Sequence, residues 1–150
     1  MKKEIYLILD NIRSRENVGS IFRTADAVGV SKIYLCGTTP TPPHDKISKT
    51  ALGAETYVPW EYRRNTWQVI TELKKEGINI YALEQTKDSK NIFRFKPKFP
   101  MALIVGNEFN GISPKILKYC DKKIAIPMYG RKESLNVSVA TGIALYTLLI

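Results

Sequence analysis

Apolar residues occur along the chain in short continuous runs and in longer stretches with helical spacing. The runs predict six strands, at residues 5–9, 32–36, 56–60, 78–83, 101–105 and 123–126. The helical spacing predicts helices at residues 16–28, 65–76 and 113–119, and a fourth that ends the chain. The alternation predicts an α/β fold, a mainly parallel six-stranded sheet sandwiched by helices, in a single domain over residues 1–150.

Polar segments separate these elements, and those at the carboxyl ends of strands are candidates for a site, because ligands bind there in α/β folds. The candidate loops are residues 10–17, 84–89, 106–112 and 127–134. Residues 38–49 read as a long, proline-rich and basic loop, which is also a candidate for function. Residues 87–100 read as irregular and basic.

The stretch 124–150 carries the clearest signal. It predicts a short apolar strand interrupted by Pro127, then a polar loop, then a final helix that is apolar almost all round. A helix without a polar face must be buried or covered by a partner. Ser134, Asn136 and Ser138 lie at its predicted start, where hydroxyl and amide groups can satisfy free backbone N–H groups. A polar entrance to an apolar helix therefore marks a candidate site.

The charge of the chain favours a polyanionic partner. Lys and Arg number 23 against 14 Asp and Glu, a net charge of +9. Such a surplus usually indicates nucleic acid, although solubility alone also explains a basic surface. Cys36 and Cys120 lie in apolar contexts without a CxxC motif, which predicts buried free thiols. No segment reads as a signal peptide or a membrane span, so we expect a cytoplasmic protein that does not bind a membrane.

Several common chemistries are disfavoured. The loop after the first predicted strand, residues 10–17, contains no glycine, which argues against NAD enzymes and the commonest Rossmann-type methyltransferases. A Walker A sequence is absent, which argues against phosphoryl transfer. His44 is the only histidine, so neither a Ser-His-Asp triad nor a histidine-based metal site can be assembled, and we expect no metal.

Two places hold candidate chemistry, and each has an alternative. Glu108 lies in the loop GNEFNG at a strand's carboxyl end, although this loop is equally well explained as a polar turn whose glycines adopt positive φ. Arg23 lies beside small residues of the first helix, Gly19 and Ala27, which leave space for a ligand. The alternative is an exposed arginine paired with Asp26, which contributes little.

Three segments together are more specific than any one of them. They are NVGSIFRTADAVG (residues 17–29), LIVGNEFNGIS (103–113) and IPMYGRKESLNVSVATGIALY (126–146). In order and spacing they resemble the three motifs of the TrmH/SpoU branch of the SPOUT RNA methyltransferases. The resemblance implies S-adenosylmethionine-dependent methylation of a ribose 2′-hydroxyl in tRNA or rRNA. It also implies a C-terminal trefoil knot, which is rare among proteins, and a homodimer, which the apolar final helix supports.

The same resemblance implies roles for individual residues. The implied catalytic set is polar and consists of Asn17, Arg23, Glu108, Ser134 and Asn136. The implied cofactor pocket is lined by Leu83, Gly106, Ile126, Ser134 and Leu135. The basic residues that we expect to bind RNA are Arg13, Arg23, Lys46 and Arg131. Because the pKa of arginine lies above about 12, Arg23 either loses a proton when held against an RNA phosphate or positions that phosphate while another group accepts the proton.

Alternatives stay open at this point. One is a knotted RNA-binding protein without catalysis, which the presence of all five polar residues disfavours. Another is base methylation, as in other SPOUT branches; the Asn17 and Arg23 pair and the SLN sequence at residues 134–136 favour ribose instead. A generic nucleotide-binding α/β domain is the third. We expect the catalytic core alone, without the N-terminal RNA-binding domain that many relatives carry, and no residue identifies the target nucleotide.

Overall fold

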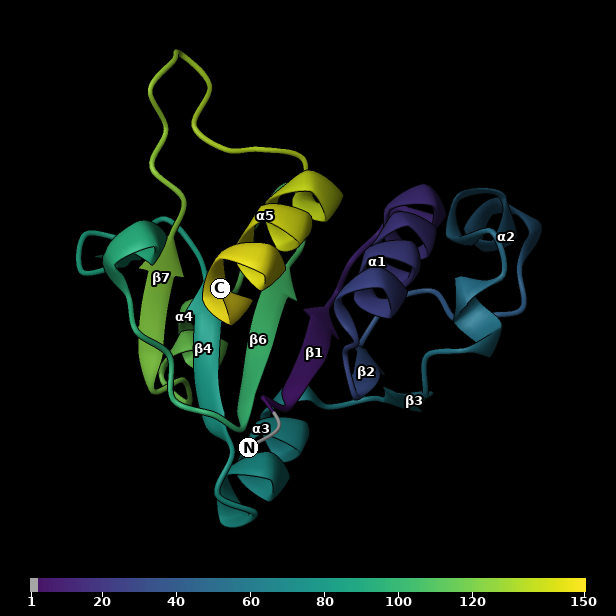
Figure 1. Cartoon of the computed structure of the whole chain (residues 1–150), viewed down its shortest axis with the longest axis horizontal. Helices are drawn as coiled ribbons and strands as arrows, with labels where there is room; N and C mark the ends of the chain where they lie inside the picture. Colours follow the sequence, from purple (N-terminus) through teal and green to yellow (C-terminus); the bar gives the residue numbers. More distant parts are fainter. Residues whose placement is uncertain (1–2) are drawn as a thin grey trace.

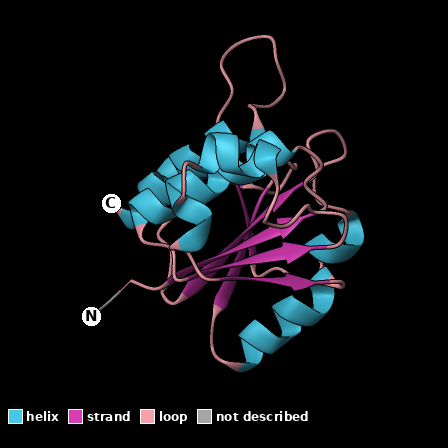
Figure 2. Ribbon diagram, turned by 90° about the vertical axis from the view of Figure 1, so that its right-hand side faces the viewer, coloured by secondary structure: helices cyan, strands magenta, loops and turns pink. Residues whose placement is uncertain are grey.

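The computed structural model describes residues 3–150 and contains one parallel sheet (Figure 1). Its strands are β1 (Ile5–Asp10), β2 (Lys32–Cys36), β3 (Trp60–Arg63), β4 (Asn79–Leu83), β5 (Lys90–Asn91), β6 (Met101–Gly106) and β7 (Lys122–Ala125). They lie in the order β3-β2-β1-β6-β4-β7-β5, and every neighbouring pair is parallel. All carboxyl ends therefore meet at one edge of the sheet, opposite the C-terminus (Figure 2).

Helices cover both faces of the sheet, which confirms the predicted sandwich (Figure 2). One face carries α1 (Arg15–Val28), α2 (Asp45–Ala51) and α5 (Val137–Leu149), together with the short 3-10 helices η1 (Ala54–Thr56) and η2 (Ile92–Arg94). The other face carries α3 (Thr66–Lys75) and α4 (Pro114–Leu117). Each face buries its own apolar cluster, and the central strands β1, β4 and β6 contribute to both because their side chains alternate.

The local sequence explains the position of α1. Ser14 caps its start, because the Ser14 hydroxyl accepts a hydrogen bond from the backbone N–H of Asn17 at 3.1 Å. Gly29 ends it with φ of 84°, a conformation that glycine adopts at no steric cost. At Gly19 the helix meets α2 so closely that an added Cβ would lie 2.2 Å from the Ile47 carbonyl oxygen. The start of α1 is thereby fixed at the carboxyl edge of β1.

The last helix, α5, is only partly buried within one chain. Thr141, Ala144, Leu145 and Leu148 face the core. On the outer side Val139 and Tyr146 are 50% and 49% exposed, although the helix is apolar almost throughout. The apolar pattern predicted that this helix packs against the rest of the protein, and one side of it does. The other side is not covered within a single chain.

The structure corrects the sequence-based prediction in three places. The sheet has seven strands instead of six, because residues 90–91 add β5 beside β7. The third strand was predicted at residues 56–60, but Thr56 ends η1 and the strand itself begins at Trp60. The segment 38–49, predicted as a loop, contains the start of α2. The trefoil knot stays a prediction. Cys36 is buried and Cys120 half-buried, and both are free thiols.

Candidate active site

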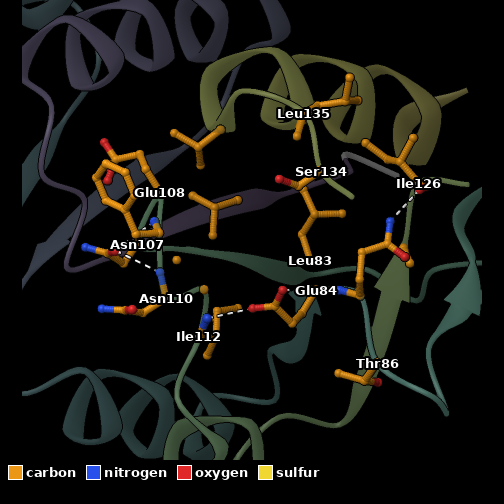
Figure 3. Close-up of a pocket in the computed structure, with 18 of the residues that line it drawn as sticks. Leu83, Glu84, Thr86, Asn107, Glu108, Asn110, Ile112, Ile126, Ser134 and Leu135 are labelled. Atoms are coloured by element: carbon orange, nitrogen blue, oxygen red, sulfur yellow. Dashed lines mark hydrogen bonds between the residues drawn. The ribbon is translucent and has the colours of Figure 1, made fainter. Parts of the chain in front are cut away.

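A cavity of about 520 Å³ opens at the carboxyl ends of β4, β6 and β7 and reaches the start of α5 (Figure 3). Most of its lining residues come from four segments, within residues 83–86, 105–114, 125–128 and 134–140. Figure 3 shows Asn107, Glu108 and Asn110 on one side, with Ile126 and Leu135 on the opposite side. Three of the loops chosen from the sequence (84–89, 106–112 and 127–134) contribute residues to this cavity.

The loop after β6 folds tightly onto itself. At Gly106 an added Cβ would lie 2.6 Å from the Gly111 carbonyl carbon and 2.7 Å from the Ile112 backbone nitrogen, so only glycine fits. Asn107 and Gly111 form an isolated antiparallel bridge across the loop. The Glu84 carboxylate accepts a hydrogen bond from the backbone N–H of Ile112 at 2.6 Å (Figure 3). Glu84 thus ties the loop after β6 to the loop after β4.

Glu108 joins this loop to the start of α1. Its Oε1 accepts a hydrogen bond from the backbone N–H of Arg13 at 2.8 Å. Its Oε2 accepts one from the backbone N–H of Ser14 at 2.8 Å and one from the Asn17 side-chain amide at 3.0 Å. Burial alone would raise the pKa of Glu108, but these hydrogen bonds favour the charged form and the pKa is lowered overall.

Asn136 extends the connection to the start of α5. Its Oδ1 caps that helix by accepting hydrogen bonds from the backbone N–H groups of Ser138 at 2.9 Å and Val139 at 3.3 Å. Its Nδ2 donates to Oδ1 of Asn17 at 3.2 Å. Asn136, Asn17 and Glu108 therefore form a chain of side-chain hydrogen bonds that links the starts of two helices to the loop after β6.

The residues expected to line a cofactor pocket lie together. Leu83, Gly106, Ile126, Ser134 and Leu135 all line the cavity, and so do Glu108 and Asn136. Asn17 lies outside the lining and reaches it through its two hydrogen bonds. Sequence reasoning missed Glu84 and Gln85, whose side-chain amide donates to the Ile126 carbonyl oxygen at 2.7 Å. The available signal was the same as for Glu108, a polar residue directly after a strand.

The basic residues lie elsewhere. Arg13, Arg23, Lys46 and Arg131 are exposed, and none of them lines the cavity of its own chain. Within the described residues, the Arg23 guanidinium takes part in no hydrogen bond or ion pair, so the alternative pairing with Asp26 is not formed. Arg13 contributes to the site through its backbone N–H alone. Arg23 is thus the one member of the implied polar set that is neither in the cavity nor bonded to it.

Among residues 3–150, His, Cys, Asp and Glu side chains nowhere gather in groups of three or more that could hold a metal ion. None of the helices in the described part of the chain has the length and apolarity needed to cross a membrane.

Comparison with known proteins shows the family of this chain. Residues 4–146 match the model of the SpoU rRNA Methylase family. The chain belongs to this family. A tRNA (guanosine(18)-2′-O)-methyltransferase of Aquifex aeolicus is 41% identical over 146 residues, which cover 97% of this chain and 68% of that protein. The 23S rRNA (guanosine(2553)-2′-O)-methyltransferase RlmP of Bacillus subtilis is 35% identical over 144 residues, which cover 95% of this chain and 56% of the relative.

Solved structures of SpoU family proteins share the fold. The A. aeolicus TrmH/SpoU tRNA modifying enzyme superposes with a TM-score of 0.88 at 39% identity, over 98% of this chain and 74% of that one. An AdoMet-bound rRNA methyltransferase from Sinorhizobium meliloti superposes with a TM-score of 0.91 at 31% identity, over 98% and 56%. The chain spans little more than half the length of several of these relatives. The match includes the three segments that the hydrogen bonds of Asn17, Glu108 and Asn136 join.

Proposed function

We propose that the chain transfers a methyl group from S-adenosylmethionine to a ribose 2′-hydroxyl of tRNA or rRNA. One observation carries the proposal: the chain of hydrogen bonds from Asn136 through Asn17 to Glu108. It joins three segments that are far apart in the sequence, each with a motif of the family, and two of them, those of Glu108 and Asn136, line one cavity. The relatives named above, which act on tRNA and on rRNA by their names, support the reaction and leave the RNA class open.

The cavity suits the cofactor. Its volume of about 520 Å³ lies within the usual range for small-molecule sites, about 300–1,000 Å³. Leu83, Ile126 and Leu135 offer apolar surface for an adenosine, and Glu84 and Glu108 place carboxylates at a site that must accept a cation. When bound there, S-adenosylmethionine supplies an electrophilic methyl group on a positively charged sulfur. A solved structure of a relative with AdoMet bound, 31% identical to this chain, supports the assignment.

The polar residues position the reactants. Glu108 and Asn17 fix the start of α1 against the loop after β6, and Asn136 fixes the start of α5. Ser134 lies in the lining just before α5, where its hydroxyl can reach a ribose. Since a ribose hydroxyl is weakly acidic and attacks a methyl group in line, placement and removal of one proton are the main requirements. This framework meets the first requirement with hydrogen bonds that already exist.

Arg23 acts, in this proposal, on the cavity of a second subunit. It is exposed on α1, which packs beside α5, where the Thr24 methyl group meets Gly142. The adjacent outer side of α5 exposes Val139 and Tyr146, large apolar residues that a twin would cover. A homodimer formed through this face would carry Arg23 into the interface. There it either gives up a proton against an RNA phosphate or holds that phosphate while another group accepts the proton.

RNA binding would rest on the basic surface. Arg13, Lys46 and Arg131 are exposed in or beside loops, and the net charge of +9 favours a polyanion. Phosphate contacts of this type position an RNA without reading its sequence. Binding should therefore weaken steeply as salt rises.

The deciding experiment is ribose-methylation mapping of total RNA from cells with and without the gene. We expect one site to lose its 2′-O-methyl group when the gene is absent and to regain it when purified protein and S-adenosylmethionine are added to that RNA. Complementation with Arg23→Ala serves as the matched control. If the RNA binds but no nucleotide changes, the protein is a binder without catalysis. If a base instead of a ribose loses its methyl group, the acceptor in the proposal is wrong.

A further inference from the structure

Phe109 follows Glu108 in the loop after β6 and is unusually exposed for its type. The residue is 81% exposed, and it also lines the cavity. A residue can line a cavity and remain this exposed when it lies at the rim of the opening. A phenylalanine at the surface leaves apolar area in contact with water, and this contact is unfavourable in the isolated chain. The hydrogen bonds of Glu108, Asn17 and Asn136 do not involve the ring, so the framework described above does not explain it.

The backbone that carries Phe109 is held on both sides. Oδ1 of Asn107 accepts hydrogen bonds from the backbone N–H groups of Phe109 at 2.9 Å and Asn110 at 3.0 Å. Nδ2 of Asn107 donates to the Asn11 carbonyl oxygen at 2.8 Å, which ties the loop to the carboxyl end of β1. Glu108, the residue before Phe109, is held to the start of α1 by the hydrogen bonds that its carboxylate accepts from Arg13 and Ser14. The ring is therefore presented from a fixed base, which lowers the entropy that a ligand must overcome.

We infer that Phe109 is a stacking surface for a base of the substrate RNA, at or next to the nucleotide whose ribose enters the cavity. The inference rests on the proposed function and names a residue that determines substrate binding. Proteins recognise RNA mainly in single-stranded loops, whose unstacked bases lie on aromatic side chains. Such stacking tolerates any base, because every base has a π-face. A ring at the rim would hold the base outside while the attached ribose reaches Ser134 and Asn136 inside.

Two other occupants fit the observations less well. An adenine of the cofactor would lie enclosed among apolar residues such as Leu83 and Ile126, whereas Phe109 remains mostly in solvent. A second subunit would cover the outer side of α5 with Val139 and Tyr146, which belongs to a different element from the loop after β6. The chemistry of a basic protein whose cavity opens beside an exposed ring favours a nucleobase.

The test is a series of variants at this position. Phe109→Leu keeps apolar surface and removes the π-face, Phe109→Ala removes both, and Phe109→Tyr and Phe109→Trp keep an aromatic ring. The probe is total RNA from cells that lack the gene, with transfer of radiolabelled methyl groups as the rate. Tyr57→Ala is the matched control, because Tyr57 is 75% exposed, as Phe109 is, but follows η1, away from the cavity.

We expect the KM for RNA to rise about tenfold in both Phe109→Ala and Phe109→Leu, and to stay near the wild-type value in the aromatic variants and in Tyr57→Ala. The dissociation constant of S-adenosylmethionine, measured by calorimetry, should be unchanged throughout. In Phe109→Trp, RNA should quench more tryptophan fluorescence than in the wild type, which already contains Trp60 and Trp67. A structural role alone would move none of these readouts in this pattern.

Each contrary result has one meaning. If Phe109→Leu retains the wild-type KM, apolar contact suffices and stacking is wrong. If the cofactor dissociation constant rises in Phe109→Ala, the ring contacts the cofactor and the inference is wrong. If the wild-type protein methylates no RNA, the proposed function fails, and the tryptophan quenching by RNA still decides whether this ring stacks on a base.

Discussion

At the scale of single residues, Glu108 is the most heavily used side chain of the site. Its two carboxylate oxygens accept three hydrogen bonds, from the backbone of Arg13 and Ser14 and from the Asn17 amide. Burial raises its pKa, and the three donors lower it by more. A carboxylate held in this way is a poor proton acceptor at neutral pH. Its geometry is that of a residue that positions α1 against the cavity.

The first prediction concerns the variant Glu108→Gln. An amide offers one acceptor oxygen in place of two and brings an NH₂ group toward N–H donors, so we expect the free energy of unfolding to fall by about 1–3 kcal/mol at neutral pH. Urea unfolding measures the loss. Glu133→Gln, an exposed glutamate in the loop before α5, is the control and should stay within about 0.5 kcal/mol of wild type.

The pH dependence of that difference has a definite sign. Because the folded-state pKa of Glu108 lies below the ordinary value of 4.5, the carboxylate stabilises the fold fully above pH 4.5. This contribution is lost as the pH falls through the lowered folded-state pKa. The wild type and Glu108→Gln should therefore converge in acid. A difference that stays constant down to that pH would show that the charge of Glu108 contributes nothing.

At the scale of elements, the site depends on two helix starts. Asn136 has separate functions at its two ends: Oδ1 caps α5, and Nδ2 donates to Asn17. A substitution can keep one and remove the other. Asn136→Asp retains a cap that the helix dipole favours, but sets an oxygen against Oδ1 of Asn17. Asn136→Ala removes both.

The second prediction follows from this difference. Asn136→Ala should lose about 0.5–2 kcal/mol of stability, whereas Asn136→Asp should unfold near the wild-type urea concentration. Both should lose most methyl transfer, because both break the link between α5 and α1. Urea unfolding and initial rates on the same preparations separate stability from activity. Full activity in Asn136→Asp would show that the link to Asn17 is not needed.

Helices and strands were predicted correctly where burial in the core determines the structure. The prediction failed where capping residues and local backbone interactions determine it. Strands β1, β2, β4 and β6 are buried, and their continuous runs of apolar residues were sufficient to predict them. The helix α2 was missed because prolines precede it and only His44, whose Nδ1 accepts from the Lys46 N–H at 3.1 Å, caps its start. The third strand was misplaced because Val58 is buried in the core without pairing in the sheet, and the strand begins at Trp60.

Site prediction shows the same division. Glu108 and Asn136 were identified because they follow or precede regular elements whose edges meet at one side of the sheet. Glu84 also follows a strand, but it was not predicted as a site residue. The sequence does not show that its carboxylate accepts a hydrogen bond from the Ile112 N–H. The rim position of Phe109 is likewise invisible in the sequence, since a phenylalanine is usually assigned to the core.

At the scale of the whole molecule, one chain leaves the proposed reaction incomplete. The cavity contains Glu108, Ser134 and Asn136, while Arg23 lies exposed on α1, a helix that packs beside α5. The outer side of α5 exposes Val139 and Tyr146. A symmetric dimer through this face would bury the apolar residues and place each Arg23 in the interface. The exposed apolar stripe and the unpaired arginine thus have a common explanation.

The third prediction tests this arrangement by mixing two inactive variants. Arg23→Ala keeps an intact cavity and lacks the arginine, whereas Asn136→Asp keeps the arginine and has a defective cavity. In a mixed dimer with action across the interface, the intact cavity of one subunit receives the intact Arg23 of the other, so random exchange should restore about a quarter of wild-type methyl transfer. If Arg23 acts on its own cavity, neither subunit has a complete site and mixing restores nothing. Sedimentation of each variant is the control, because the comparison requires that both variants remain dimers. If the wild type sediments only as a monomer, the second subunit has no part in the mechanism.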